Sequence, residues 1–460
     1  MHLRDLSLWH DTLPADDELM PRPGLPGDLH VDVAIVGAGY TGLWTAYYLK
    51  RRNPDMRIAI VESEVAGFGA SGRNGGWCSA LLPMGFEAMA ATHGPDGATR
   101  LQRAMNATVD EVGDVARREG IDCHFAKGGT LRAARNPAHI GRMQAEVAEH
   151  RAFGFGEDDI RWMDADEARS RVAMTDVLGG VYTPHCAAIH PARLVRGLAR
   201  VVEAMGVGVY EGTRVQAIEP HRLVTDRGVV RTEHIVRATE GFTPTLPGQR
   251  RTIIPIYSLM IATEPLPTSF WDEVGLRRRE TFSDGRRLVI YGQRTADDRF
   301  AFGGRGAPYH FGSAVKPEYD RNERTHAGIH HTLVELFPAA AGAEVTHRWG
   351  GPVGVPRDWY CSVGHDPATG LAWAGGYVGD GVGTTNLAGR TLCDLISGDR
   401  TDLTDLPWVN HRSRSWEPEP LRWLGINAMV RLPMGVDAYE AKHQRPEKLR
   451  SRVLDAVVGH

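Results

Sequence analysis

The sequence predicts an α/β fold that begins with a strand–helix–strand unit, and three observations indicate it. A run typical of a buried strand, Val31–Val36, is followed by the glycine-rich turn Gly37–Gly42. The helix Leu43–Arg52 comes next, with apolar residues near helical spacing, and a second apolar strand covers Arg57–Val61. About thirty residues in this order are typical of a βαβ unit, whose two strands are parallel.

The later elements follow from the same patterns. Helices are predicted for 87–120, 143–151, 190–205, 325–337 and 384–397. A strand pair is predicted near 207–218 and 222–237, and strands of a larger sheet at 252–264, 287–292 and 299–305. The tail from residue 401 carries three tryptophans that we expect to hold it on the body of the protein: Trp408, Trp416 and Trp423.

The composition is that of an ordinary globular protein. Of 460 residues, 42% are apolar and 24% charged, which excludes a disordered, collagen-like or coiled-coil chain. With 53 basic and 57 acidic residues the net charge is −4, which disfavours a nucleic-acid groove. No apolar run approaches the ~18–20 residues that span a membrane, and we expect no membrane span.

The start of the chain and the cysteines indicate a location. The first residues lack the charged-then-apolar layout of a signal peptide. Five cysteines occur without Cys-x-x-Cys spacing, which argues against a disulfide framework and against a zinc site. We therefore expect a cytoplasmic protein without a metal site.

The first glycine turn has the spacing that a dinucleotide needs. Gly37 permits a tight turn, Gly39 the close approach of a pyrophosphate, and Gly42 close packing of helix on strand. The N-terminus of the following helix offers free N–H groups to the phosphates. Glu62 ends the second strand, twenty residues after Gly42, where an acid accepts hydrogen bonds from ribose hydroxyls. The other predicted contacts of this turn are Ala38, Tyr40 and Thr41.

Two further glycine-rich segments select FAD over NAD. Residues 67–76 follow directly on Glu62, and such a loop lets backbone run beside a long flat ligand, beyond the pyrophosphate. Residues 375–383 precede a helix whose start, pointed at the N1–C2=O edge of a flavin, would stabilise the anionic reduced ring. The contacts predicted in these two segments are Ala70, Ser71, Arg73, Asn74, Gly75, Gly76, Gly376, Gly379, Asp380, Gly381, Val382 and Gly383.

Taken together, Val33–Gly39, Glu62, Ala70–Gly76 and Gly375–Gly383 resemble the FAD-dependent amine and amino-acid oxidoreductases. This is the D-amino-acid oxidase-like family, which includes glycine oxidase and sarcosine oxidase. The amino-acid sequences of the loop Gly67–Gly76 and of Gly376-Tyr377 are most similar to those of the gamma-glutamylputrescine oxidase branch. The resemblance implies two more cofactor contacts, at Val215 and at Thr239.

The resemblance also implies the domain organisation. A discontinuous FAD-binding Rossmann-like domain would comprise residues 31–85, 186–250 and 345–400. A second, mixed-sheet α+β substrate domain would comprise 86–185 and 251–344. Residues 1–30 would be an N-terminal lead-in, and residues 401–460 a C-terminal tail packed on the body.

The function that the resemblance implies is oxidation of a C–N bond. A small-molecule amine or amino-acid-like substrate would transfer hydride to FAD, the imine would hydrolyse to a carbonyl and ammonia or a smaller amine, and oxygen or another acceptor would take the electrons. Sarcosine oxidases carry an oxygen-activating lysine over the flavin, whereas the comparable strand here, Arg299–Gly304, has none. Cys361 is near the region where some relatives attach flavin, but the alignment favours non-covalent FAD.

The sequence is also compatible with two other functions. A FAD-dependent monooxygenase shares the first βαβ unit but usually reads Gly-Asp-Ala-Ala-His where this chain has Gly379–Gly383. A non-catalytic flavin-binding protein would bind the same cofactor without turning over an amine. A plain NAD dehydrogenase is disfavoured because it would leave the second glycine loop unexplained.

The catalytic residues are not identified by any motif. Weak candidates are Arg305, Trp359 and Tyr257, because aromatic rings and arginine near a flavin face can hold an amine or its substituents. Core packing or a surface ion pair explains most of the remaining candidates better than a site does: Met260, His310, Arg348, Trp349, Tyr360 and Cys78. A membrane-surface role for residues 421–456 is disfavoured by the acids in that stretch, Glu440, Glu447 and Asp455.

Overall fold

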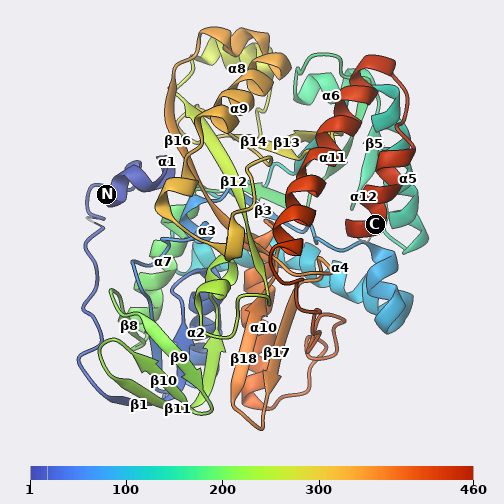
Figure 1. The fold of residues 1–460 in the computed structure, drawn as a ribbon. Coiled ribbons are helices and arrows are strands. Elements are labelled where there is room, and N and C mark those ends of the chain that lie inside the picture. Colours follow the sequence, from blue (N-terminus) through green and yellow to red (C-terminus); the bar gives the residue numbers. More distant parts are fainter. Residues whose placement is uncertain (1, 18, 459–460) are drawn as a thin grey trace.

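The structure is a computed structural model, and it describes residues 2–17 and 19–458, with side chains as far as Leu454. Within these residues the strands form two eight-stranded sheets and a two-stranded ladder between them. Figure 1 shows one sheet below and the other above, with the ladder and the short helix α3 (Ala70–Arg73) at the level where they meet. This mixed α/β architecture is the predicted fold class.

The first sheet contains the predicted βαβ unit. Its central strands β11, β1 and β2 are parallel, and β18 extends the parallel set on the β11 side. Its strands, in the order of the sheet, are β17 (Ser362–Asp366), β18 (Leu371–Gly375), β11 (Val229–Arg237), β1 (Leu29–Val36), β2 (Ile58–Val61) and β8 (Gly208–Tyr210), with β9 (Val215–Glu219) and β10 (Arg222–Thr225) joined through β11.

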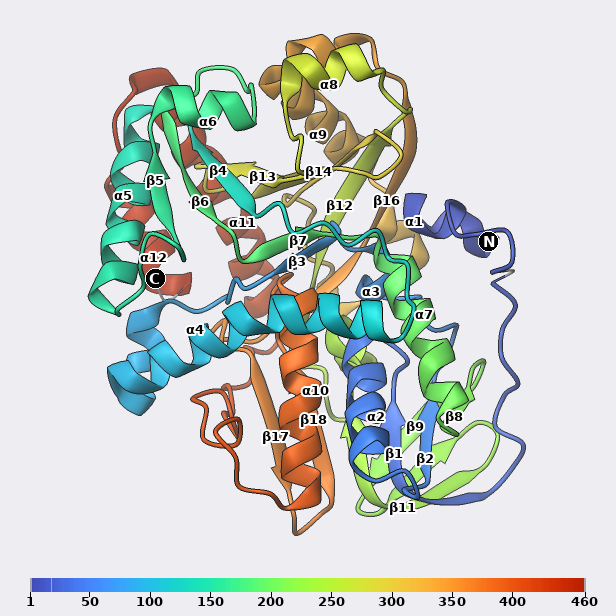
Figure 2. The same ribbon diagram turned by 180° about the vertical axis from the view of Figure 1, so that it is seen from behind.

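Apolar layers cover both faces of this sheet, which explains why β1 and β2 read as continuous apolar runs. Figure 2 shows helices on one face: α2 (Tyr40–Arg52), α7 (Pro191–Ala204) and α10 (Gly381–Ser397). The long helix α4 (Phe86–Arg118) crosses above them, between the two sheets. On the other face Leu25 of the lead-in and Leu223 of β10 pack on Ala34, Val36 and their neighbours.

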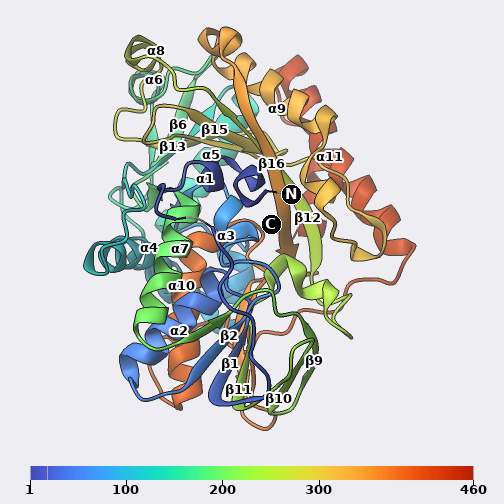
Figure 3. The same ribbon diagram turned by 90° about the vertical axis from the view of Figure 1, so that its left-hand side faces the viewer.

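The second sheet is mixed and lies above the first. Its order is β16 (Val345–Val355), β12 (Ile254–Thr263), β15 (Phe300–Gly304), β14 (Ile290–Arg294), β13 (Thr281–Asp284), β4 (Thr130–Ala134), β6 (Gly179–Thr183) and β5 (Arg161–Met163). The helices around it are α5 (Pro137–Ala152), α6 (Ala165–Arg171), α8 (Thr268–Val274) and α9 (Glu323–Leu336). Figure 3 shows β12 and β16 running from this sheet down toward the first one.

The remaining elements connect or flank the sheets. The ladder pairs β3 (Trp77–Ser79) with β7 (Cys186–Ala188). The lead-in forms η1 (Leu3–Leu6) and α1 (Leu8–Asp11), and the tail forms α11 (Leu421–His443) and α12 (Leu449–Val458). Short 3-10 turns are η2 (Glu240–Thr245), η3 (Phe311–Ser313), η4 (Pro317–Asp320) and η5 (Pro338–Gly342).

The division of the chain between the sheets differs from the expected one at β16. The sequence analysis placed residues 345–400 with the flavin domain, whereas β16 pairs along its length with β12, from Ile254 opposite Val355 to Thr263 opposite Val345. Apolar and glycine patterns predict that a strand exists but not which sheet it joins, because pairing partners are distant in sequence.

The tail packs on the body at two of its three tryptophans. Trp408 is fully buried in the main core, and Trp416 donates from its indole nitrogen to the carbonyl of Val355 at 2.9 Å. Trp423, in contrast, is 39% exposed on α11, so the expectation was wrong for this residue.

Candidate functional site

A cavity of about 1390 Å³ lies where the carboxyl ends of the first sheet's strands meet the second sheet. Ligands of open α/β sheets bind at this edge. Sixteen of the predicted cofactor residues line the cavity: Gly37, Gly39, Tyr40, Thr41, Glu62, Ala70, Ser71, Arg73, Asn74, Gly75, Val215, Thr239, Gly379, Asp380, Gly381 and Val382. Segments that are far apart in sequence are therefore brought to one place.

The turn after β1 requires glycine for reasons visible in its geometry. Gly37 has φ +107°, and a Cβ there would lie 2.7 Å from the carbonyl oxygen of Ala238. A Cβ at Gly42 would lie 2.1 Å from the carbonyl of Gly37. Gly39 begins α2 without a side-chain cap, so N–H groups of the first turn stay available to a ligand. Among the residues that the structure describes, the one partner of these groups is the Ser71 hydroxyl, which accepts from the N–H of Tyr40 at 2.9 Å.

Glu62 is fixed at the end of β2. Its Oε2 accepts from the N–H of Ala38 at 2.8 Å, and its Oε1 accepts from the N–H of Glu64 at 2.9 Å. Burial raises the pKa of this carboxyl, although both backbone bonds oppose the rise. A carboxylate held in one orientation beside the glycine turn suits the ribose hydroxyls of an adenine nucleotide.

The second glycine segment is held in shape from several sides. The Gln293 side-chain amide donates to the carbonyls of Gly75 at 2.8 Å and of Gly76 at 3.1 Å. The lead-in supports it from beneath, because the indole of Trp9 donates to the carbonyl of Asn74 at 2.8 Å. The guanidinium of Arg73 is itself committed to Asp320, at 2.6 Å. The backbone turn, more than the Arg73 charge, thus faces the cavity.

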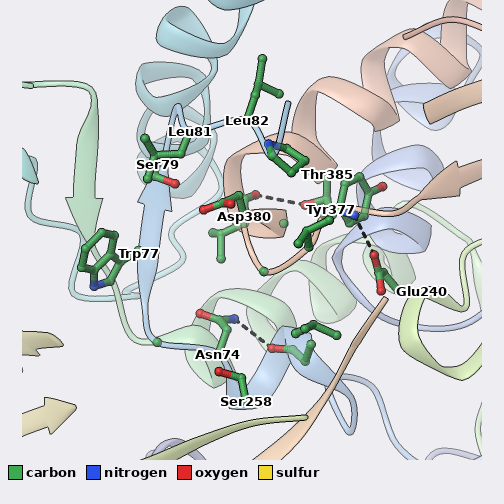
Figure 4. Close-up of a pocket in the computed structure, with 18 of the residues that line it drawn as sticks. Asn74, Trp77, Ser79, Leu81, Leu82, Glu240, Ser258, Tyr377, Asp380 and Thr385 are labelled. Carbon is green, nitrogen blue, oxygen red and sulfur yellow. Dashed lines mark hydrogen bonds between the residues drawn. The ribbon is translucent and has the colours of Figure 1, made fainter. Parts of the chain in front are cut away.

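Glu240 joins the late glycine segment to β16, and the sequence analysis did not identify it. Its Oε1 accepts from the N–H groups of Gly376 and Tyr377, each at 2.9 Å, and its Oε2 from that of Gly354 at 2.6 Å. Figure 4 shows the contact with Tyr377. Burial raises the pKa of Glu240 to about 7, against the effect of these N–H donors. Its place directly after Thr239 was the available signal.

A chamber adjoins the late glycine segment, and we define it by the cavity-lining residues Trp77, Ser258, Tyr291, Arg305, Trp359 and Asp380. The hydroxyls of Ser258 and Tyr291 are 2.7 Å apart, and the rings of Trp77 and Tyr291 meet edge to face at 6.4 Å. Figure 4 shows Trp77, Ser258 and Asp380 around this space.

Arg305 and Asp380 give the chamber its charges. The guanidinium of Arg305 donates to the carbonyl of Val378 at 2.7 Å and lies 5.8 Å from the centre of the Trp359 ring. Burial raises the pKa of Asp380 to about 6, and the positive charge of Arg305 opposes that rise. Arg305 and Trp359, predicted as weak candidates, are thus placed in the chamber.

Tyr257, the third weak candidate, does not reach the cavity. Successive side chains of a strand point to opposite faces, and on β12 it is Ser258 that faces the cavity. Tyr257 instead packs edge to face on His310 and Tyr319. The cavity lining likewise omits the other candidates, Met260, His310, Arg348, Trp349, Tyr360 and Cys78, and five predicted cofactor residues, Ala38, Gly42, Gly76, Gly376 and Gly383.

Two of these five predicted residues have a packing role behind the lining. A Cβ at Gly76 would lie 1.9 Å from the Gln293 side-chain nitrogen, and one at Gly383 would lie 2.5 Å from the carbonyl of Ser79. Their small size lets α10, β3 and β14 approach one another closely. Gly76 and Gly383 therefore shape the cavity without forming its surface.

The cavity continues outward as an arm between α4, α5 and the second sheet. Four carboxylates line it, Glu87, Glu146, Glu149 and Asp159. Glu146 pairs with Arg132, and Asp159 lies 3.0 Å from His185. Burial and the negative charge of Glu87 raise the pKa of Glu149. Basic side chains line the same arm, Arg132, Arg142 and His150 among them.

Residues 32–395 match the protein family described as FAD dependent oxidoreductase (DAO). The chain belongs to that family. It is an enzyme that depends on FAD, and the resemblance noted in the sequence is confirmed. The glycine turns, Glu62 and the uncapped start of α2 fit this cofactor, since each gives the nucleotide or its phosphates a matching partner.

Curated relatives of the family agree over most of the chain. It is 31% identical to a probable oxidoreductase, OrdL, of Rhizobium meliloti (strain 1021), over 86% of this chain and 89% of that protein. It is 28% identical to gamma-glutamylputrescine oxidoreductase of Escherichia coli (strain K12), over 82% of this chain and 86% of that protein.

Solved structures share the fold. Glycine oxidase from Geobacillus kaustophilus superposes with a TM-score of 0.68 at 22% identity, over 83% of this chain and 99% of that one. L-proline dehydrogenase from P. horikoshii gives a TM-score of 0.68 at 17% identity, over 83% and 96%. The fold class predicted from the sequence is confirmed by these matches.

Two further findings concern the described residues only. None of their helices is long and apolar enough to cross a membrane. They also contain no cluster of three or more His, Cys, Asp or Glu side chains suited to a metal ion.

Proposed function

We propose that this family member oxidises a C–N bond of an amine or amino-acid-like substrate, and that the resulting imine is hydrolysed to a carbonyl compound and ammonia or a smaller amine. The observation that carries the proposal is the continuity of one cavity. It is lined at one end by the glycine cradle of the nucleotide and at the other by the aromatic chamber of Trp77, Tyr291 and Trp359. Relatives named for glycine, sarcosine and gamma-glutamylputrescine support an amine substrate.

FAD, when bound, supplies the acceptor for the hydride that leaves the carbon next to the amine nitrogen. The chain's own contribution is to bind and orient the amine and to limit water. The substrate must arrive as the neutral amine, because only then can its lone pair assist the departure of hydride. The positive charge of Arg305 disfavours a second cation in the chamber and so assists loss of the amine proton.

We propose a polyamine-like or modified amino-acid substrate. The outer arm supports this choice, since Glu87 and Glu149 place two carboxylates near each other along the path from the chamber. A distal ammonium group would relieve their mutual repulsion. The name of the Escherichia coli relative, a gamma-glutamylputrescine oxidoreductase, agrees with a substrate of this shape.

The electron acceptor is oxygen or another oxidant, and the chain's lysines bear on which. The strand β15 carries no lysine, as the sequence indicated. Lys316 is the one lysine among the cavity-lining residues, and its ammonium lies 3.5 Å from Glu318 with its side chain 54% exposed. A solvated, paired lysine is a weak substitute for one above a flavin, so we propose slow reoxidation by oxygen.

The remaining parts of the proposal concern attachment and location. Non-covalent FAD is supported by Cys361, which does not line the cavity and whose thiol lies 3.7 Å from the sulfur of Met84. Burial raises the pKa of this thiol, which makes it a poor nucleophile. Five free cysteines in the described chain support a reducing compartment, and we propose the cytoplasm.

The deciding experiment is an anaerobic reduction screen of the purified yellow protein. Amines, polyamines and N-methyl amino acids are each mixed with it, and loss of flavin absorbance is followed by stopped flow. Bleaching by an amine supports the proposal, and admission of air then separates an oxidase from a dehydrogenase. Rapid reduction by NADPH, with no bleaching by any amine, would show that the class of reaction is wrong.

A further inference from the structure

The tail helix α11 has an inner side that is fully engaged by the body. Glu440 is completely buried and accepts from the Arg142 guanidinium at 2.8 Å. Asp437 accepts from the N–H groups of Arg287 at 2.6 Å and of Leu288 at 2.9 Å. These are the two acids in the sequence of α11, so both of its negative charges are turned toward the body.

The outer side of α11 is apolar and exposed, which is unusual for a surface helix. Leu424 is 54% exposed, Met434 52% and Trp423 39%, and Ala428 and Ala438 are also exposed. Helical spacing places these residues on one side, with Arg431 as the charge among them. Figure 3 shows α11 on the outside of the molecule.

A neighbouring turn enlarges this apolar surface. Phe311 of η3 is 60% exposed, and the N–H of the next residue, Gly312, donates to Glu419 at 2.9 Å. Tyr309 and Asn427 exchange two further hydrogen bonds, of 3.2 and 3.0 Å. The loop is thereby fixed beside the first turns of α11. We call Phe311, Trp423, Leu424, Ala428, Arg431, Met434 and Ala438 the tail face.

A cluster of basic residues comes directly after the tail face in the sequence. Five basic residues from the last turn of α11 to the first turn of α12 are exposed: Lys442, Arg445, Lys448, Arg450 and Arg452. The one acid among them, Glu447, is used as a cap, since its Oε2 accepts from the N–H of Arg450 at 2.6 Å. Two apolar side chains accompany the bases, Leu449 at 74% exposure and Val453 at 45%.

We propose that the tail face and the basic segment 442–452 dock the protein on the surface of an anionic lipid membrane. An exposed apolar side with tryptophan and leucine, followed by clustered lysine and arginine, can bind an anionic lipid surface through apolar burial and charge together. Because none of the described helices can cross a membrane, the contact lies in the plane of the surface. A second copy of this chain is a poorer occupant, since a two-fold contact would bring like charges together.

This inference reverses the expectation drawn from the sequence. There, Glu440, Glu447 and Asp455 counted against a membrane surface. The structure removes Glu440 from the surface altogether and commits Glu447 to the start of α12. The side chain of Asp455 lies outside the described residues.

The test is flotation of the purified holoprotein with vesicles. Phosphatidylcholine vesicles are compared with vesicles that also contain phosphatidylglycerol, at low and at high salt. We expect the protein to float with the anionic vesicles only, and less at high salt. Trp423→Ser with Leu424→Ser should weaken partitioning by about tenfold or more, and Lys448→Glu by about fivefold at low salt.

Matched controls distinguish binding through the tail face from non-specific adsorption to the vesicles. Met20→Ser removes an apolar side chain that is 68% exposed elsewhere, and Arg117→Glu reverses a charge that is 77% exposed elsewhere. Both should float as the wild type does, with flavin content and thermal unfolding unchanged in every variant. A wild type that stays with the soluble fraction, or tail-face variants that still float fully, would overturn the proposal. So would a dimer that Leu424→Ser dissociates, without vesicle binding.

Discussion

Glu240 accepts a hydrogen bond of 2.6 Å from the backbone N–H of Gly354, and through its other oxygen it holds Gly376 and Tyr377. One carboxylate thus fixes the late glycine segment, from the first sheet, against β16 of the second. Glu240 itself adopts φ +39°, a conformation that non-glycine residues adopt rarely, and three hydrogen bonds retain it.

Glu240→Gln should weaken flavin binding and lower the melting temperature, because the amide nitrogen cannot accept from these N–H groups. Leaving buried N–H groups without an acceptor costs ~1–3 kcal/mol. Flavin fluorescence titration and thermal unfolding measure the two effects. Glu233→Gln, at an exposed position on the preceding strand β11, is the matched control and should change neither.

The pH dependence of the Glu240 effect has a definite sign. Its folded pKa of about 7 lies above the ordinary value of 4.5, so the folded state retains the proton longer than the unfolded chain. Its contribution to stability is therefore full below about pH 4.5 and falls as the pH rises to about 7. The stability difference between wild type and Glu240→Gln should decline across this window. A difference that grows with pH would contradict the assignment.

The predicted nucleotide site is tested by two separate substitutions, one that fills the glycine turn and one that removes the Glu62 carboxylate. Gly39→Val should abolish FAD binding, because even a Cβ would lie 2.9 Å from the Ser71 hydroxyl, on the path of the pyrophosphate. Glu62→Ala should weaken binding by ~1.5–3 kcal/mol through the lost ribose partner. Flavin content after purification is the measurement. Gly141→Val, where a Cβ would meet nothing within 4 Å, should leave it unchanged.

The attachment of the flavin is tested by acid precipitation. The yellow colour should stay in the supernatant, because Cys361 packs against Met84 behind the cavity. Cys361→Ser should retain its flavin to the same extent as the wild type. If colour instead remains with the pellet and is lost in Cys361→Ser, the flavin is covalently bound to this residue.

The site residues that the sequence predicted are those whose role depends on their local sequence. Glycines at a phosphate turn are visible because no other residue fits, and Glu62 is visible because it ends a recognisable strand. Glu240, Ser258 and Tyr291 were missed because their roles depend on which strands meet across the two sheets. Tyr257 was preferred to Ser258 because the aromatic ring suggested a site, while the strand's alternation places the serine in the cavity.

Substrate selection by the outer arm is tested at Glu149. Glu149→Gln should raise KM for a diamine or polyamine by about fivefold to tenfold, since a partly buried carboxylate near a cation contributes about 1 kcal/mol or more. It should leave kcat nearly unchanged, because the arm is remote from the chamber. A monoamine provides the matched substrate control, with KM unaffected. An equal loss for both kinds of amine would contradict a role in binding the distal charge.

The pH profile of flavin reduction tests Arg305 and Asp380 together. The anaerobic reduction rate should rise with pH as the bound amine loses its proton. Arg305 lowers the pKa of Asp380, which burial raises to about 6, and by the same charge it lowers the pKa of a bound amine. Arg305→Gln should therefore shift the rising limb to higher pH. Arg305→Lys should shift it much less, because the positive charge is retained while the guanidinium's hydrogen bond to Val378 is lost or altered. Arg348→Gln, which removes an exposed charge outside the cavity, should leave the limb in place. A limb that moves to lower pH in Arg305→Gln, or shifts equally in Arg305→Lys, would show that the charge of Arg305 does not control the protonation of the amine.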